Sequence, residues 1–240
     1  MSLKLRLTIM NFLQFFVWGA WLITIGRYWF ENRGWSGTSF GAIFSTMGIS
    51  ALFMPSLLGI VADRWINAEK LYGALHILGG VFLCLLPQAS DPNQFFWLIL
   101  ATMLCYMPTI SLAIAVAYNA LKREGLDVIR DYPPIRVWGT VGFIAAMWTT
   151  SLLGLEKSPG QFYVAAGAAF ALGLYAFTLP PAPPRMALAE SRSLLDVRGL
   201  TSFRLFRDRN MAVFFVFAML LGAALQLTNA YGGTFLGEFE

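Results

Sequence analysis

The chain has 240 residues, of which 58% are hydrophobic and only 12% are charged, and its mean hydropathy is +0.63. Soluble domains carry about 25% charged residues, so this composition excludes an ordinary soluble protein and indicates a membrane protein. The net charge of +4 does not indicate nucleic-acid binding, because the cations occupy short segments between apolar runs and not one basic patch.

Seven apolar runs are candidates for helices that cross the lipid bilayer, a task that takes about 20 mostly apolar residues. The sequence therefore predicts an all-α membrane protein. The runs cover residues 7–29, 39–62, 71–88, 95–121, 136–155, 160–179 and 211–236.

Basic residues are distributed unevenly between the two ends of these runs. If the N-terminus is cytoplasmic, all 17 lysines and arginines except Arg27, Arg33 and Lys157 lie on the cytoplasmic side. Cytoplasmic loops of membrane proteins carry the excess of Lys and Arg. We therefore predict a cytoplasmic N-terminus and a C-terminus on the opposite side.

Polar side chains recur at helical spacing inside the first and fourth runs. They could line a cavity for a sugar or a base, or they could form hydrogen bonds between helices. The residues of the first run are Asn11, Gln14, Trp18 and Trp21, and those of the fourth are Thr102, Tyr106 and Thr109.

The chain has one histidine, His76, so it contains no Ser-His-acid set and no zinc cluster, and it has no Gly-rich phosphate loop. We predict that the protein is not an enzyme and has no metal or cofactor. His76 is expected to pack or hydrogen-bond inside the bundle, with a proton-relay role as the alternative. Cys84 and Cys105 lie within apolar runs and are expected to pack there, without forming a disulfide.

Residues 131–143 read DYPPIRVWGTVGF and lead from a charged segment directly into an apolar run. At about 100° per residue, Arg136, Thr140 and Phe143 share one helix face, which presents a cation, a hydroxyl and a ring. We interpret this face as one wall of a polar cavity within the membrane, with Asp131 as a partner for the arginine. The alternative is an arginine that extends to the interface and a ring that faces lipid.

The same segment carries two further signals. Pro133 and Pro134 cannot donate backbone hydrogen bonds, so they are expected at a helix entrance. A neighbouring face of small residues predicts close approach of a second helix; it consists of Gly139, Gly142 and Ala146.

The seventh run contains Gln226 and Asn229 about 60° apart on one helix. Two carboxamides in an apolar helix cost free energy if they stay unpaired, so we favour a cavity-lining role for them over simple packing. None of the seven runs holds a carboxylate at mid-membrane depth.

One long connection, residues 180–210, separates the sixth and seventh runs. It opens with the stiff segment LPPAPPR and continues as SLLDVRGLTSFRLFRDRN, which predicts a short amphipathic helix on the cytoplasmic surface. We therefore divide the chain into a six-helix bundle at 1–179, a cytoplasmic linker at 180–210, and a further membrane helix at 211–240. The alternative for the middle part is an ordinary long loop.

The loop after the second run, GIVADRWINAEK, places Gly59, Asp63 and Arg64 in the G-x-x-x-D-R core of a motif of the major facilitator superfamily. There the glycine allows helices to approach and the charged pair ties a turn to helix ends. Within that superfamily the whole chain resembles the nucleoside:proton symporter family. The matching stretches are FLQFFVWGAWL, FMPSLLGIVADRW, CYMPTISL, DYPPIRVWGTVGFIAAMW and MAVFFVFAMLLGAALQLTNAYGGTFL.

This resemblance implies a transporter of twelve membrane helices in two six-helix halves, which imports purine and pyrimidine nucleosides with protons by alternating access. It implies the bacterial inner membrane as the location and the proton as the coupling ion. The substrate residues of the family correspond to Arg136, Thr140, Phe143, Gln226 and Asn229 of this sequence.

The sequence departs from the family pattern in length, because it stops just after the seventh run. The resemblance places the acidic residues for proton coupling in the C-terminal half. We therefore expect a truncated twelve-helix transporter, with the missing half as a potential partner. The rival hypotheses are a facilitator for sugars or other polar metabolites and a seven-helix receptor. The seventh run has no lysine for a retinal Schiff base, which disfavours a photoreceptor.

Overall fold

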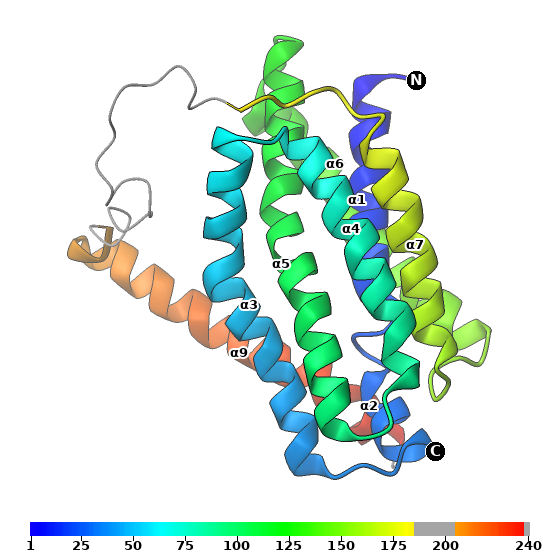
Figure 1. Ribbon diagram of the computed structural model, residues 1–240. Helices are drawn as coiled ribbons and strands as arrows, with labels where there is room; N and C mark the ends of the chain where they lie inside the picture. The colour runs from blue at the N-terminus through cyan, green and yellow to red at the C-terminus, as the bar shows by residue number, and fades with distance from the viewer. Residues whose placement is uncertain (185–204, 238–240) are drawn as a thin grey trace.

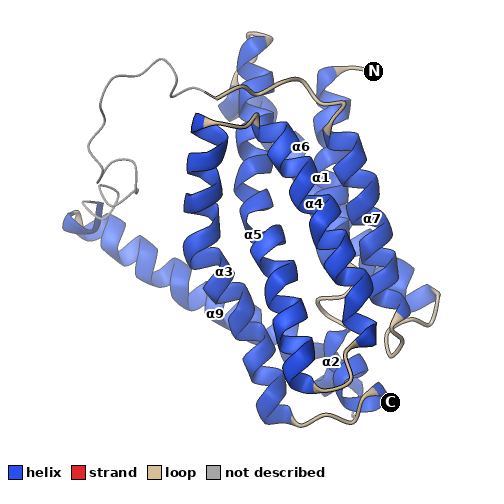
Figure 2. Ribbon diagram, viewed as in Figure 1, coloured by secondary structure: helices blue, strands red, loops and turns tan. Residues whose placement is uncertain are grey.

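The computed structural model describes residues 1–184 and 205–237, and within these ranges it is helical and contains no strand (Figures 1 and 2). A π-helix at Tyr28–Asn32 follows α2, and a 3-10 turn at Leu86–Gln88 follows α4. The α-helices are α1 (Leu3–Gly19), α2 (Ile25–Arg27), α3 (Gly37–Arg64), α4 (Ala68–Leu85), α5 (Pro92–Arg123), α6 (Val128–Leu152), α7 (Gly160–Ala176) and α9 (Arg209–Gly237).

A long helix occupies each of the seven predicted runs. By length and composition, four segments of the described residues are able to cross a membrane: α3, α4 with its following turn, α5, and α9 over Arg209–Asn229. Helix α7 is apolar but shorter. The all-α class predicted from the sequence is confirmed for the described residues.

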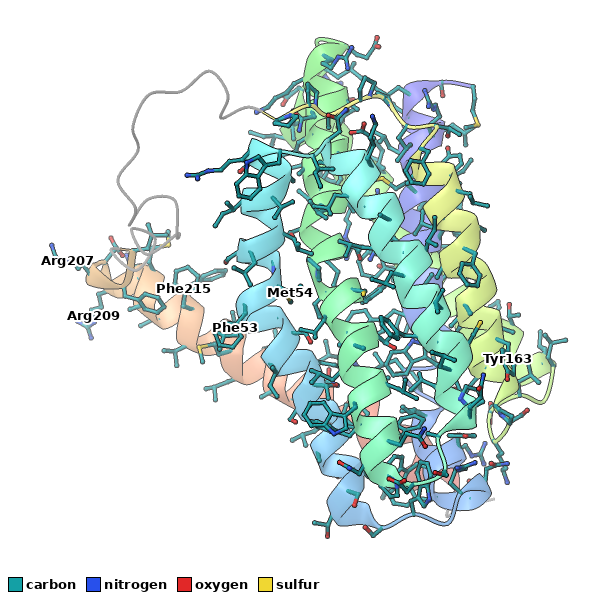
Figure 3. The ribbon with its side chains drawn as sticks, in the orientation of Figure 1. Phe53, Met54, Tyr163, Arg207, Arg209 and Phe215 are labelled. Atoms are coloured by element: carbon teal, nitrogen blue, oxygen red, sulfur yellow. The ribbon has the colours of Figure 1, made fainter. Side chains whose placement is uncertain are left out.

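Helices α1, α3, α4, α5, α6 and α7 run alongside one another and form a bundle, and α9 crosses them obliquely (Figure 1). Within the bundle α1 packs on α6, α4 packs on both α5 and α7, and α3 packs on α5. Helix α9 touches the bundle mainly near α2 and α3. Its first turns, with Arg209 and Phe215, lie at the edge of the molecule, next to Arg207 of the preceding turn (Figure 3).

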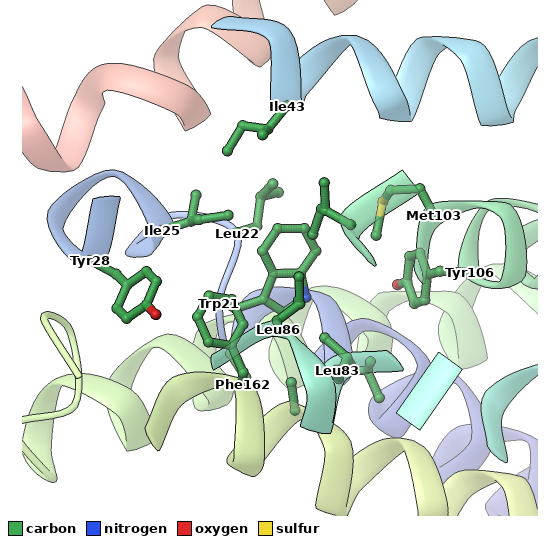
Figure 4. Packing of buried hydrophobic residues seen from close by; sticks show 14 of the residues in the cluster. Trp21, Leu22, Ile25, Tyr28, Ile43, Leu83, Leu86, Met103, Tyr106 and Phe162 are labelled. Carbon is green, nitrogen blue, oxygen red and sulfur yellow. The ribbon is translucent and has the colours of Figure 1, made fainter. Parts of the chain in front are cut away.

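Buried aromatic and aliphatic side chains pack together in one large cluster (Figure 4). Tyr28 and Phe162 are in edge contact at 5.1 Å between ring centroids, and Trp21 is buried beside them. Because lipid is as apolar as these rings, close packing stabilises this region more than the removal of surface from water does.

Small residues bring α1 and α6 together. A Cβ on Gly142 would overlap the carbonyl oxygen of Phe12, and a Cβ on Gly19 would lie 2.5 Å from the carbonyl oxygen of Phe143. Ala146, one turn beyond Gly142, is fully buried. The predicted close approach along the Gly139–Ala146 face is confirmed, and its partner is α1.

The prediction of one continuous helix over 7–29 is wrong, because α1 ends at Gly19 and α2 begins only at Ile25. The carbonyl oxygen of Ala20 accepts a hydrogen bond from the hydroxyl of Thr150 at 3.0 Å. This bond from α6 satisfies a backbone acceptor at the break, so the helix can end here without leaving it unpaired.

Helix α6 begins at Val128, so the expectation that Pro133 and Pro134 mark a helix entrance is wrong. Asp127 caps the helix by accepting from the backbone N–H of Ile129 at 2.9 Å. Because proline has no N–H, Pro133 and Pro134 remove the helical hydrogen bonds to the carbonyls of residues 129 and 130. Residues 129 and 130 are exposed, so water can donate to these carbonyls instead.

The connection between α7 and α9 is described only in part. Residues 185–204 lie outside the described residues, so the predicted amphipathic helix is not tested. Residues 205–207 form a single 3-10 turn immediately before α9.

Charged side chains join the loops at the end of the bundle opposite Lys4. Arg27 pairs with Glu156, and Glu31 pairs with Lys157 at 2.5 Å and with Arg27 at 3.3 Å. The hydrogen bond from Lys157 is the largest cause that lowers the pKa of Glu31; burial opposes it, and Arg27 adds to the lowering. This network connects the α2–α3 segment to the α6–α7 loop.

We expect Gly142→Ala to destabilise the bundle by about 1–3 kcal/mol, because the added methyl group overlaps the backbone of α1. The thermal unfolding midpoint of the detergent-purified protein should fall. Gly167→Ala on α7 is the matched control, because a Cβ there meets no atom within 4 Å. Equal midpoints for the two variants would contradict the proposed α1–α6 contact.

The pKa of Glu31 lies below its ordinary value of 4.5, so its ion pairs stabilise the fold fully above that pH. This contribution is lost as the pH falls through the lowered pKa, because the protonated carboxyl no longer attracts Lys157. Between about pH 6 and pH 3 the unfolding midpoint of the wild type should therefore fall more steeply than that of Glu31→Gln. Parallel curves would show that the pairs do not contribute.

Candidate functional site

Arg136 lies against an aromatic ring of α1. Its guanidinium carbon is 4.0 Å from the ring centroid of Phe15, a distance typical of a cation–π interaction. Gly139 has no side chain to obstruct this path, since a Cβ there would come within 2.7 Å of the arginine. The cation is thus held beside α1, half-buried, without a carboxylate partner among the described residues.

The expectation that Asp131 pairs with Arg136 is wrong. Asp131 accepts from the ammonium group of Lys4 at 2.7 Å, and this hydrogen bond is the main cause that lowers the pKa of Asp131. Five residues separate Asp131 from Arg136, which places them about 140° apart around the helix. The Lys4 pair instead ties the start of α1 to the start of α6.

Phe143 belongs to a row of rings from three helices. It meets Trp18 of α1 edge-on at 6.3 Å, and Trp18 meets Tyr106 of α5 at 5.7 Å. Thr140, one turn before Phe143, is exposed. Of the three residues predicted on α6, Arg136 and Phe143 thus contact rings of α1, and Thr140 is exposed.

Gln226 of α9 faces α3. Its carboxamide nitrogen donates to the sulfur of Met47 at 3.4 Å, which is a weak acceptor. It also lines a pocket of about 410 Å³ between the two helices, together with Gly41, Phe44, Ala223, Leu227 and Tyr231. Asn229 is half-buried on the same helix and does not line this pocket.

The predicted residues thus form two groups, one on α6 and one on α9. Across residues 1–184 and 205–237, no hydrogen bond, ion pair or ring contact joins Arg136, Thr140 or Phe143 to Gln226 or Asn229. Each group has its own surroundings, and their joint role in one cavity stays a prediction.

Gln14 forms the centre of a buried hydrogen-bond network. Its carboxamide oxygen lies 2.6 Å from the hydroxyl of Tyr72 and 2.9 Å from Nε2 of His76, and its nitrogen donates to the hydroxyl of Thr109 at 2.9 Å. The hydroxyl of Tyr106 donates to the Gln14 backbone oxygen at 2.8 Å.

This network decides between the two interpretations of the polar residues in the first run. For Gln14 the prediction of interhelical hydrogen bonds is confirmed, and the alternative that its side chain lines a cavity is wrong. Asn11 instead donates to the Leu7 carbonyl of its own helix at 2.9 Å. His76 packs and hydrogen-bonds as expected, and Cys84 and Cys105 are free thiols. Spacing identified the polar faces of both helices; it did not identify Tyr72, which lies in a run without a polar stripe.

The G-x-x-x-D-R motif does not make the contacts expected of it. A Cβ on Gly59 would meet nothing within 4 Å, so no helix approaches there. Asp63 and Arg64 are exposed and form no ion pair or hydrogen bond within the described ranges.

Glu69 of α4 connects this helix to the segment that follows α7. The pattern of the sequence did not predict this role. It is only 3% exposed, and its carboxylate accepts from Asn67 at 3.0 Å and from the backbone of Ala182 at 2.8 Å. Arg123 donates to the carbonyl oxygen of Pro181 at 2.8 Å. The proline segment after α7 is therefore fastened across the ends of α4 and α5.

Comparison with known proteins identifies relatives over the entire chain. A family model described as nucleoside H+ symporter matches residues 1–240. The chain is 46% identical over 240 residues to the nucleoside permease NupG of Escherichia coli strain K12. The matched region covers all of this chain and 57% of that permease. It is 45% identical over 239 residues to the xanthosine permease of the same organism, again with 57% of that protein covered.

Solved structures agree with the sequence comparison. The crystal structure of the nucleoside transporter NupG superposes with a TM-score of 0.86 and covers 100% of this chain and 59% of its own. The structure of a NupG mutant gives a TM-score of 0.90 over 99% of this chain and 59% of its own, and both are 46% identical in sequence. The chain thus spans less than two thirds of the length of the relatives it matches.

Gln14→Met should destabilise the protein by about 2 kcal/mol, because Tyr72 and His76 lose their buried acceptor while the side-chain volume stays similar. The thermal unfolding midpoint in detergent measures this loss. Gln88→Met is the control, since Gln88 is exposed and bonds only within its own segment. If both variants unfold at the wild-type temperature, the network does not hold the bundle together.

Proposed function

Because the chain belongs to the nucleoside H+ symporter family, we propose that it forms part of a transporter that imports nucleosides together with protons. The protein is a multi-pass membrane protein with a fold of the major facilitator superfamily type, as the sequence resemblance implied, and it is not an enzyme. The observation that carries the proposal is the match to the family over residues 1–240.

The proposed substrate has a flat base and a hydroxylated ribose, and the two groups offer matching chemistry. Carboxamides such as Gln226 and Asn229 provide both donors and acceptors for ribose hydroxyls and base edges. Arg136 and Thr140 add further donors, and Phe143 adds an aromatic surface to the α6 group. Their combination on two helices supports a site that lies between the six-helix bundle and α9.

Alternating access in this proposal requires one rigid unit and one unit that moves against it. The α1–α6 contact and the Gln14 network support residues 1–179 as the rigid unit. Helix α9 is the proposed first helix of the moving unit, because the Arg209–Asn229 segment buries none of its residues against the bundle. The second half of the transporter would be the partner of this unit.

The proton is the proposed coupling ion, and no other cofactor is proposed. The predicted spans of this chain hold no carboxylate at mid-membrane depth, so we expect the proton-binding groups in the second half of the transporter. The Escherichia coli relatives support a bacterial inner-membrane location. The distribution of basic residues supports an N-terminus in the cytoplasm.

We expect Arg136→Ala and Gln226→Ala each to reduce nucleoside uptake by about tenfold or more, because each removes hydrogen bonds to a desolvated substrate. Uptake of labelled uridine or adenosine is measured in cells that lack their own nucleoside transport and express the complete reading frame. The amount of each variant in the membrane fraction should equal that of the wild type.

Gln88→Ala, at an exposed position outside both groups, is the matched control and should leave uptake unchanged. Wild-type uptake in both site variants would remove Arg136 and Gln226 from the site. Uptake that sugars inhibit and nucleosides do not would replace the proposed substrate with a sugar.

A further inference from the structure

The pocket between α3 and α9 has the properties of a small-molecule site. Its volume of about 410 Å³ falls within the range of about 300–1,000 Å³ that is usual for ligand pockets. Its lining is mostly apolar with one carboxamide, that of Gln226, and small-molecule sites typically combine an apolar lining with few polar groups.

The carboxamide of Gln226 retains most of its hydrogen-bonding capacity. A glutamine side chain has two N–H donors and an oxygen with two lone pairs. Among the described residues only one N–H is used, and its acceptor is the sulfur of Met47. A polar group in an apolar pocket with free donors and acceptors favours a ligand that supplies the missing partners.

Two rings line the same pocket as this carboxamide, and a third ring contacts both of them. Phe40 of α3 is completely buried, and it meets Phe44 edge-on at 5.1 Å and Tyr231 edge-on at 5.5 Å. Phe44 and Tyr231 both line the pocket, one from each helix. Phe40 thus contacts both rings, so the two helices present their rings to the same pocket.

We propose that Phe44 and Tyr231 are further substrate-binding residues, which hold the nucleoside base in this pocket while Gln226 reads its polar edge. The inference rests on the proposed function. A flat base offers two apolar faces to the rings and hydrogen-bonding groups at its edge to the carboxamide. Phe44 belongs to the bundle and Tyr231 to α9, so binding of the base joins the two units of the transporter.

The experiment replaces each ring with a side chain that keeps the apolar bulk and lacks a π-face. Phe44→Leu and Tyr231→Leu should weaken the binding of labelled adenosine to the purified complete protein by about tenfold. Tyr231→Phe keeps the ring and should retain most of the affinity. The matched control is Phe53→Leu, because Phe53 is exposed on the same helix and does not line the pocket (Figure 3).

A photoprobe gives a readout that a loss of folding would not imitate. An azidoadenosine probe should label peptides of the wild type that contain Phe44 or Tyr231, and excess adenosine should suppress this labelling. If the wild type binds adenosine but both leucine variants bind equally well and the label maps elsewhere, the pocket assignment is overturned and the transport proposal stands. If the wild type neither binds nor imports nucleosides, both proposals fail together.

Discussion

One buried carboxamide, that of Gln14, connects three helices of the bundle. It bonds to Tyr72 and His76 of α4 and to Thr109 of α5, while Tyr106 bonds to the backbone of the same residue. In a medium without water these groups have no other partners, so the network fixes how α1, α4 and α5 are placed relative to one another. The ring row that runs from Tyr106 through Trp18 to Phe143 takes its position from this network.

The same constraint separates a rigid part of the molecule from a loosely attached one. Close packing at Gly142 and the ion pairs at the two ends of the bundle restrict α1 and α6. Helix α9 has no comparable attachment; its described contacts with α3 include Gln226 against Met47 and Tyr231 against Phe40. A carrier that exposes its site alternately to two sides needs such an unequal distribution of contacts, because the substrate must be able to change the relation between the units.

Much of the fold followed from sequence because its physical causes are local. Apolar length predicted the helices, and the small-residue face predicted the closest contact in the bundle. The errors arose where a distant residue decided the outcome. Thr150 accommodates the break after Gly19, Lys4 takes the carboxylate expected for Arg136, and neither partner can be identified from spacing along one helix. The motif residues Asp63 and Arg64 were found by pattern, but a pattern does not specify which chain lies opposite them.

The candidate site, too, could be predicted from the sequence only where its causes are local to one helix. Spacing on single helices predicted Arg136 and Phe143 as one group and Gln226 as the start of another, and the sequence resemblance implied the same positions. The pocket lined by Phe44 and Tyr231 could not be predicted in this way, because it exists only where α3 and α9 meet.

The most direct test of the account is nucleoside accumulation by proteoliposomes that contain the complete protein and carry an imposed proton gradient, acidic outside. Labelled nucleoside should accumulate inside above its external concentration, and a protonophore should reduce it to the equilibrium level. Entry that only equilibrates with or without the gradient, or no entry at all, would contradict a proton-coupled nucleoside carrier.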